Sequence, residues 1–156
     1  RLRRATAMAR RSTPDPLGVI REIVADQMSL TSAVSLRLRA LLPWDTIACH
    51  QLGAMHATGE GVEKDEAAAL RWYGRAARRG DPESQYDLGF MLLLGEGAGA
   101  DSEAGIRWLS FAARAGHFGA AKLLAEVYAT GDSGVPRSEA ESATWASLAE
   151  RLRNDA

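Results

Sequence analysis

Three histidines and one cysteine are the residues of this chain best suited to acid–base or nucleophilic chemistry: His50, His56, His117 and Cys49. A cysteine–histidine dyad requires the two side chains within hydrogen-bond reach, because the imidazole must take the thiol proton. Cys49 and His50 are neighbours in the chain, and neighbouring side chains on a helix point in different directions. The residues supply no ordered nucleophile and base, so we expect a protein that is not an enzyme.

The same residues make a poor metal site. His50 and His56 are six positions apart and do not share a helix face, as residues at i and i+4 would. Cys49 is the only cysteine of the chain; it can form no internal disulfide and cannot build a thiolate metal site alone. We therefore expect no metal and no cofactor. The cysteine usage also favours a reducing compartment, and we expect the cytoplasm.

Charged residues divide the 156-residue chain into two unlike parts. Residues 1–43 hold eight arginines and three acids, whereas residues 44–156 hold eleven basic and seventeen acidic residues. Residues 1–14 carry five arginines and no acid, which predicts a basic, disordered leader. An anionic partner for this leader is an alternative interpretation, with nucleic acid disfavoured. No run of about 18 apolar residues is present, so the sequence predicts no membrane span.

A repeat of about 36 residues organises the rest of the chain. The recurring residues are Trp72, Trp108 and Trp145, and the pairs Leu52-Gly53, Leu88-Gly89 and Leu124-Ala125. The pairs recur at intervals of 36, and one extra residue in the glycine-containing loop 131–135 explains the interval of 37 between the last two tryptophans. Self-similarity at this period is typical of solenoids, in which each unit buries its apolar face against the next.

Each unit has the pattern of two amphipathic helices, called helix A and helix B here. In helix B of the first unit, apolar and small residues from Ala69 to Gly80 fall at i, i+3, i+4, i+7, i+8 and i+11, one stripe of a 3.6-residue period. The helix A stripes are Ala48, Leu52, Gly53 and His56, then Ser84, Leu88, Gly89 and Leu92, then Ala120, Leu124, Ala125 and Tyr128. These residues are the predicted core.

Capping residues agree with this periodicity. Gly59, Gly95 and Gly131 stand where helix A should end, since glycine adopts the left-handed conformation at little cost. The predicted N-caps of helix B are Asp65, Asp101 and Ser138. Between the first two units, Gly80-Asp81-Pro82 supplies a helix stop, a cap and a proline at the first helical position.

The units resemble the Sel-one-like repeat, a relative of the tetratricopeptide repeat. Its pattern is Ala-x3-Leu-Gly-x2-Tyr-x2-Gly-x-Gly-Val-x2-Asp-x3-Ala-x2-Trp-x3-Ala-Ala-x2-Gly, with His56, Leu92, Ala98, Gly105 and Ser142 as departures. The resemblance implies an all-α protein, a right-handed α-solenoid of helix-turn-helix repeats. Residues 45–153 would form three repeats with a C-terminal capping helix. Residues 15–44 would form a degenerate leading helical pair, with 31–42 as its second helix.

The resemblance also implies a binding surface, because helix A lines the concave side of such solenoids. Tyr86, Phe90 and Leu93 lie at i, i+4 and i+7, on a face that the core stripe does not use. The candidate partner-binding residues are His50, Ala54, Glu83, Tyr86, Phe90, Leu93, Lys122 and Glu126. We expect a scaffold or adaptor that binds a protein or peptide there. The alternative is that these side chains pack against neighbouring helices.

Two further interpretations are weaker. Cysteine-rich relatives of this family are assigned β-lactamase or penicillin-binding activity, and the hydrolase alternative follows from that resemblance; the single Cys49 disfavours it because those units are stapled by cysteine pairs. Arginines also recur on helix B, at positions 78, 114 and 151 and seven residues earlier at 71 and 107. Neighbouring acids favour a solvated helix face over a nucleic-acid contact there.

Overall fold

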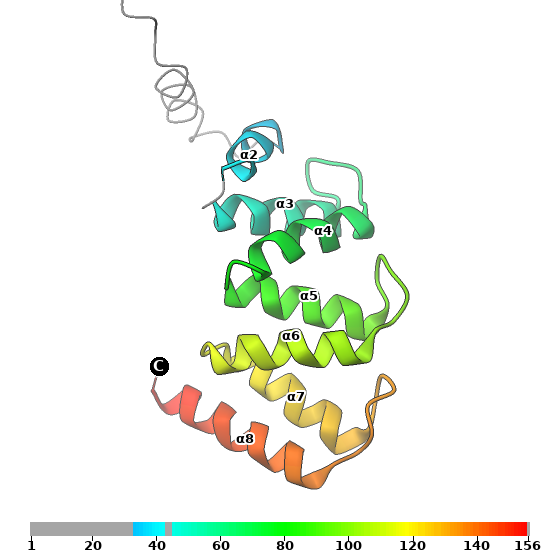
Figure 1. Ribbon diagram of the computed structural model, residues 1–156, viewed down its shortest axis with the longest axis vertical. Helices are drawn as coiled ribbons and strands as arrows, with labels where there is room; N and C mark the ends of the chain where they lie inside the picture. The colour runs from blue at the N-terminus through cyan, green and yellow to red at the C-terminus, as the bar shows by residue number, and fades with distance from the viewer. Residues whose placement is uncertain (1–32, 43–44, 156) are drawn as a thin grey trace, which may run out of the picture.

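The computed structural model describes residues 33–42 and 45–155, and all regular secondary structure in these residues is α-helical. The helices are α2 (Ala33–Ala40), α3 (Thr46–Thr58), α4 (Glu66–Ala77), α5 (Pro82–Leu94), α6 (Ser102–Arg114), α7 (Phe118–Thr130) and α8 (Glu139–Asn154). They stack in chain order in one column (Figure 1), and each packs mainly on its neighbours in the chain. The prediction of an all-α solenoid is confirmed.

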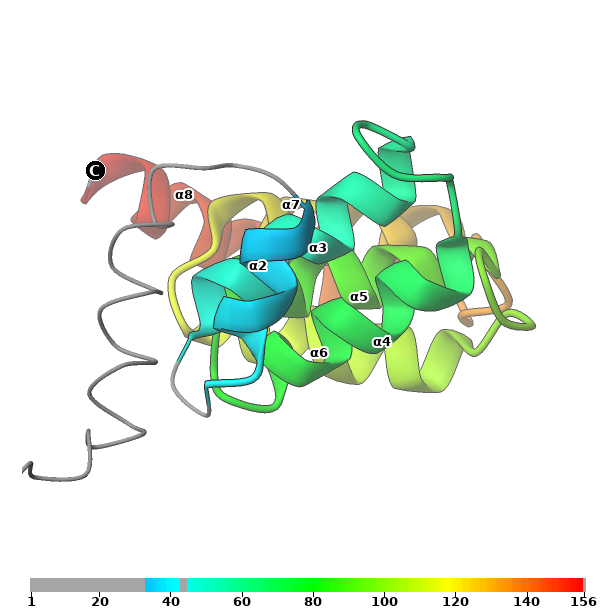
Figure 2. The same cartoon turned by 90° about the horizontal axis from the view of Figure 1, so that it is seen from above.

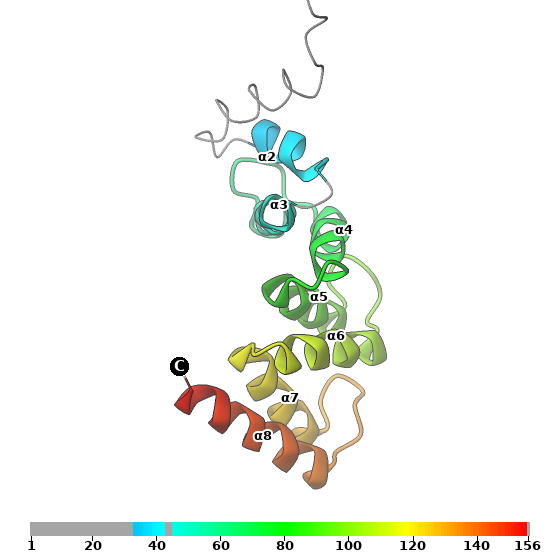
Figure 3. The ribbon, with the colours of Figure 1, turned by 60° about the vertical axis from the view of Figure 1, so that its left-hand side comes forward.

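The repeat unit is a pair of antiparallel helices: α3 with α4, α5 with α6, and α7 with α8. The loops within the three pairs lie along one edge of the column, on the right in Figures 1 and 2. In profile, α3 and α5 lie toward the inner side of a curved stack, with α4 and α6 outside them (Figure 3). Helix A of the first two units therefore lies on the inner side.

The ends of the helices follow the predicted capping residues. Gly59, Gly95 and Gly131 adopt left-handed φ angles of 83°, 78° and 79° and end α3, α5 and α7. The N-caps of α4, α6 and α8 are Asp65, Asp101 and Ser138, whose side chains accept hydrogen bonds from backbone N–H groups three residues on. Each cap satisfies a backbone donor that the helix itself leaves unpaired.

Close helix contact depends on two glycines in the second unit. A Cβ atom at Gly89 would lie 2.9 Å from the carbonyl oxygen of Gly105 and 2.8 Å from Cγ of Leu109. A Cβ atom at Gly105 would lie 2.9 Å from the carbonyl oxygen of Gly89. The backbones of α5 and α6 thus approach each other at these positions, and Leu109 fills the adjoining space without exposure to solvent.

The leading part of the chain is described only in part. Helix α2 lies inside the predicted segment 31–42, and Leu36 and Ala40 are buried against α3 and α4 in one cluster. The basic leader 1–14 and the first helix of the predicted leading pair lie outside the described residues. In the part of the chain that the structure describes, no helix is long and apolar enough to cross a membrane.

Candidate binding surface

Large apolar side chains remain exposed on helix A of the second and third units. Phe90 and Leu94, one turn apart on α5, are 38% and 53% exposed, and Phe118 at the start of α7 is 43% exposed. Leaving such side chains in water forfeits their transfer free energy. Several on one face therefore indicate a contact surface.

Two shallow grooves run beside these side chains. The α5–α7 groove, of about 330 Å³, is lined by Phe90, Leu93, Leu94, Leu123, Glu126, Val127, Thr130, Asp132 and Ser133. The α7–α8 groove, of about 340 Å³, is lined by Phe118, Lys122, Ala125, Glu126, Ala129, Ala146, Ala149, Glu150 and Arg153. Both grooves include Glu126, so they adjoin along α7. Together they form an apolar surface with charged residues at its margin.

Three rings form a stack beside the α5–α7 groove. Tyr86 lies between Phe90, with ring centroids 6.2 Å apart and planes inclined by 19°, and His117, with centroids 4.6 Å apart and planes inclined by 16°. The stack joins helix A of the second unit to the junction with the third. The exposed ring of Phe90 therefore has an aromatic neighbour on its own helix.

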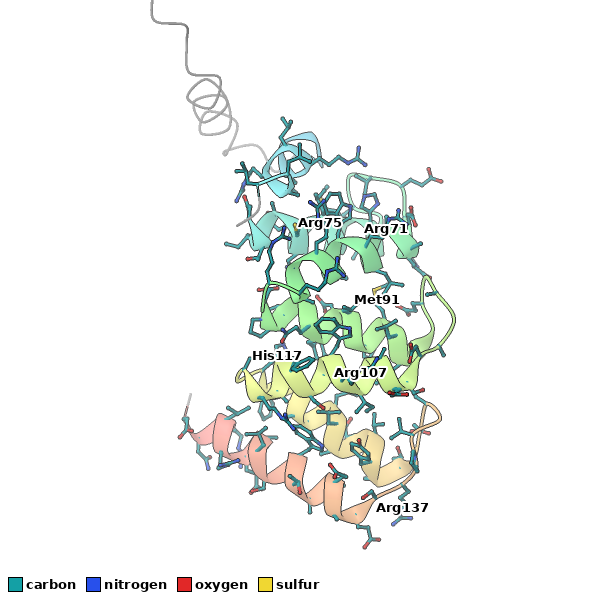
Figure 4. The ribbon with its side chains drawn as sticks, in the orientation of Figure 1. Arg71, Arg75, Met91, Arg107, His117 and Arg137 are labelled. Carbon is teal, nitrogen blue, oxygen red and sulfur yellow. The ribbon has the colours of Figure 1, made fainter. Side chains whose placement is uncertain are left out.

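His117 has a structural role at the junction between the second and third units. It is the N-cap of α7 and is labelled in Figure 4. Its Nδ1 accepts a hydrogen bond of 3.0 Å from the N–H of Ala120. Its Nε2 lies 3.2 Å from a carboxylate oxygen of Glu83. Because Nδ1 is an acceptor, the ring proton belongs on Nε2, which donates to Glu83. These two hydrogen bonds at the junction account for the histidine at this position.

His50 is likewise tied to neighbouring helices. Its Nε2 lies 3.0 Å from Oδ2 of Asp87 on α5, and its ring meets that of Tyr73 at a centroid distance of 5.5 Å. The hydrogen bond to Asp87 raises the pKa of His50 above its ordinary value. Burial, with the charge of Asp87, raises the pKa of Tyr73. The three residues form a polar link between the first and second units.

The placement of Leu93 corrects one expectation. It was predicted to face a partner with Tyr86 and Phe90, but it is only 5% exposed and belongs to the core that α6 and α7 share. The cause lies in Gly105, which has glycine where the repeat pattern has alanine: Cγ of Leu93 lies 2.9 Å from where a Cβ atom would be. Leu93 fills the space that the missing methyl group leaves and reaches the groove only as part of its floor.

The other predicted residues divide into two groups. Glu83, Lys122 and Glu126 are exposed, and Nζ of Lys122 lies 3.9 Å from Oε1 of Glu126 on the same helix. Ala54 is half-buried and packs against the α4–α5 core. The structure therefore brings Tyr86, Phe90 and the charged residues of α7 to one surface, while His50 and Ala54 lie in the contacts between the first and second units.

Sequence reasoning missed several residues of this surface. Leu94 continues the face of Phe90 and immediately precedes Gly95, where the helix ends. Phe118 precedes the first predicted core position of α7, Leu123 lies between two of them, and neither belongs to a motif. The spacing of Phe90 and Leu94 at i and i+4 was the available signal, since such residues share a helix face.

Cys49, the one candidate nucleophile named from the sequence, lies in the core. Cys49 is fully buried, and burial raises the pKa of its thiol, which disfavours the reactive thiolate. Within residues 33–42 and 45–155, no three His, Cys, Asp or Glu side chains converge so as to hold a metal ion. The chain contains no second cysteine that could staple a unit.

Comparison with known structures shows the same fold elsewhere. A Sel1 repeat protein from Oxalobacter formigenes aligns with 85% of this chain at 21% identity, with a TM-score of 0.66. A protective antigen of uropathogenic Escherichia coli strains, with an SLR fold, aligns with 83% of it at 25% identity and the same TM-score. The present chain spans 54% of the first protein and 32% of the second. No curated protein sequence matches the chain.

The sequence pattern of one repeat family fits the helical pairs. The Sel1 repeat matches residues 46–81, 82–117 and 119–154, and each match begins at or beside the start of helix A and ends at or just after the end of helix B. These segments make up more than two thirds of the 156 residues, and the chain therefore belongs to the Sel1 repeat family.

Proposed function

We propose that this chain is a protein-binding scaffold and that a segment of a partner protein lies across the α5–α7 and α7–α8 grooves. The observation that carries the proposal is the exposed apolar pair Phe90 and Leu94 beside a groove whose floor contains Leu123. A partner that covers this surface removes apolar area from water and adds few buried charges.

The same surface suggests the chemistry of the partner segment. Its centre is apolar, so side chains such as leucine or phenylalanine fit the floor. Its margin carries Glu126 and Asp132 beside the first groove, and Glu150 and Arg153 beside the second. Charged residues of both signs at the margin of a binding surface orient a partner segment and disfavour segments with the wrong charge pattern. They contribute less to affinity. An amphipathic helix or an extended peptide with spaced apolar residues meets these requirements.

The experiment compares crosslinked pull-downs from native lysate for wild type, Phe90→Glu and Phe111→Glu. Phe111 is the matched control, since it is 53% exposed on helix B, outside both grooves. Equal helical circular dichroism must first show that all three proteins fold. Leu93 is left unchanged because its side chain belongs to the core.

A partner retained by wild type and Phe111→Glu but lost by Phe90→Glu supports the groove. For that purified partner, loss of a central aromatic contact should weaken binding about 30-fold, because such contacts contribute about 2 kcal/mol. Identical partner sets for the three proteins would contradict the proposal, as would a loss confined to Phe111→Glu.

A further inference from the structure

Two adjoining cavities lie at the other end of the column, among α2, the α3–α4 loop and α4. The larger, of about 660 Å³, is lined by Arg37, His56, Val62, Glu63, Lys64, Asp65 and Glu66. The smaller, of about 390 Å³, is lined by Arg37, His56, Asp65, Ala68, Arg71, Trp72 and Arg75. They share Arg37, His56 and Asp65, and neither shares a residue with the α5–α7 or α7–α8 groove.

The smaller cavity gathers positive charge. Three guanidinium groups line it, against the single carboxylate of Asp65. That carboxylate accepts a hydrogen bond from the N–H of Ala68 at 2.9 Å and lies 3.8 Å from Arg71. Within the described residues, neither Arg37 nor Arg75 forms an ion pair. Like charges held together without partners are unfavourable unless an anion joins them.

His56 adds a buried polar group to this cavity. The residue is 8% exposed, and its Nδ1 has no hydrogen-bond partner in the part of the chain that the structure describes. An unpaired polar atom in a buried position costs free energy. Nδ1 of His56 can therefore form a hydrogen bond with a ligand in the cavity.

Trp72 forms part of the wall and positions one of the cations. The guanidinium carbon of Arg75 lies 5.0 Å from the centre of the Trp72 ring. This cation–π contact restrains Arg75 without neutralising it. Figure 4 labels Arg71 and Arg75 on α4, and Arg107 one unit further along on α6. Arg37 of α2 and Arg71 and Arg75 of α4 thus line one cavity, and Trp72 restrains Arg75.

Three of the polar residues at this cavity are replaced by aromatic or apolar residues one repeat further along the chain. Thirty-six residues further on, the positions of Arg37, His56 and Arg75 are taken by Tyr73, Leu92 and Phe111. Leu92 and Trp108 pack there against an apolar core. Asp65, Arg71 and Trp72 instead recur as Asp101, Arg107 and Trp108. The shared residues are explained by the fold, and the three departures from the repeat all meet in one cavity.

We propose that this cavity, bounded by Arg37, His56, Arg71, Trp72 and Arg75, binds the phosphoryl group of a small phosphomonoester. Guanidinium groups match phosphate oxygens in paired hydrogen bonds. Three guanidinium groups and one carboxylate give a formal charge of +2, which a phosphoryl group of charge near −2 neutralises. The volume of about 390 Å³ leaves space for the organic part of the ligand beside Trp72.

Acidic residues beside the cavity favour one isolated anionic group over a polyanion. Glu63, Asp65 and Glu66 line the adjoining larger cavity, and Glu66 is paired with Lys64 at 2.9 Å. A nucleic-acid strand would bring further phosphates against these carboxylates. A single phosphoryl group reaches the guanidinium groups without that repulsion.

The test is isothermal titration calorimetry of the full chain at constant ionic strength, with phenyl phosphate, inorganic phosphate and phenylacetate as probes. The first variant is Arg37→Gln. The second is His56→Leu/Arg75→Phe, which installs residues that the second unit already carries and so preserves the packing pattern. Arg107→Gln is the matched control, because Arg107 occupies the position of Arg71 in the next unit and pairs with Glu103 at 2.6 Å.

Saturable binding of phenyl phosphate, weakened about tenfold or more in both site variants and unchanged in Arg107→Gln, supports the proposal, since one charge-assisted contact is worth about a factor of ten. Inorganic phosphate that binds as tightly as phenyl phosphate also supports the phosphoryl site and identifies the free ion as its ligand. Absence of saturable binding, equal binding of phenylacetate, or an equal loss in Arg107→Gln would overturn it.

Discussion

His50 and Asp87 join the first repeat to the second, with Nε2 of His50 3.0 Å from Oδ2 of Asp87. Both side chains are 31% exposed, so solvent screens the pair only in part. Tyr73 lies against the histidine ring from α4. Contacts between successive units determine whether a solenoid unfolds as one body or unit by unit. This pair is therefore expected to couple the first two units.

The first prediction concerns the pH dependence of this coupling. Because the pKa of His50 is raised in the folded protein, the ion pair contributes its full stabilisation below the pKa of an unfolded histidine, about 6.5. That contribution is lost as pH rises through the raised folded-state value. His50→Gln should therefore lower the free energy of unfolding by about 1 kcal/mol at pH 5.5 and by less at pH 9.

Urea unfolding followed by circular dichroism measures this difference at both pH values. The control is His50→Gln in an Asp87→Asn background, where the substitution should have the same effect at pH 5.5 and pH 9. A histidine effect that persists unchanged in that background would show that Asp87 is not the partner responsible.

Neighbouring leucines provide the second prediction. Leu93 is 5% exposed in the core, and Leu94 is 53% exposed beside it. Leu93→Ala should lower the free energy of unfolding by about 2–4 kcal/mol, because the deletion leaves a cavity at Gly105. Leu94→Ala should change it by about 0.5 kcal/mol or less. Chemical unfolding of the two variants tests the burial of Leu93, and equal losses would contradict it.

The repeat period, the helix caps and the core stripes could be read from the sequence because each depends on local spacing. Asp65 and Gly59 act on the backbone within a few residues, so their roles follow from position alone. Leu93 was misplaced because its burial depends on Gly105 in the next helix. The periodicity of one helix contains no information about a side chain that is missing from the neighbouring helix.

The candidate surfaces were less predictable for the same reason. Phe90 and Tyr86 were identified from their spacing on one helix, whereas the stack with His117 requires the next unit to be in place. The cavity at Arg37, His56 and Arg75 combines residues from three helices. Comparison of each position with its equivalent 36 residues later was the signal that could have found it.

The third prediction tests the close contact between α5 and α6. Gly89→Ala places a methyl group 2.9 Å from the carbonyl oxygen of Gly105, so the helices must separate. The expected loss is about 1–3 kcal/mol of unfolding free energy, despite the better helix propensity of alanine. Gly99→Ala is the control, because a Cβ atom there meets no atom within 4 Å. A stabilised Gly89→Ala variant in thermal unfolding would contradict the contact.

The fourth prediction concerns the cap of α7. His117→Ala removes the acceptor of the Ala120 N–H and the ring that stacks on Tyr86, so the free energy of unfolding should fall by about 1 kcal/mol or more. His117→Asn keeps a capping acceptor but lacks the ring. If the cap is the main contribution, asparagine should recover most of the loss of unfolding free energy. Urea unfolding of both variants measures this.

The His117 ring also contacts Tyr86, which stacks on Phe90. His117→Asn should therefore weaken partner binding to the α5–α7 groove even where stability is recovered. Unchanged binding with recovered stability would separate the cap from the groove and confine His117 to folding.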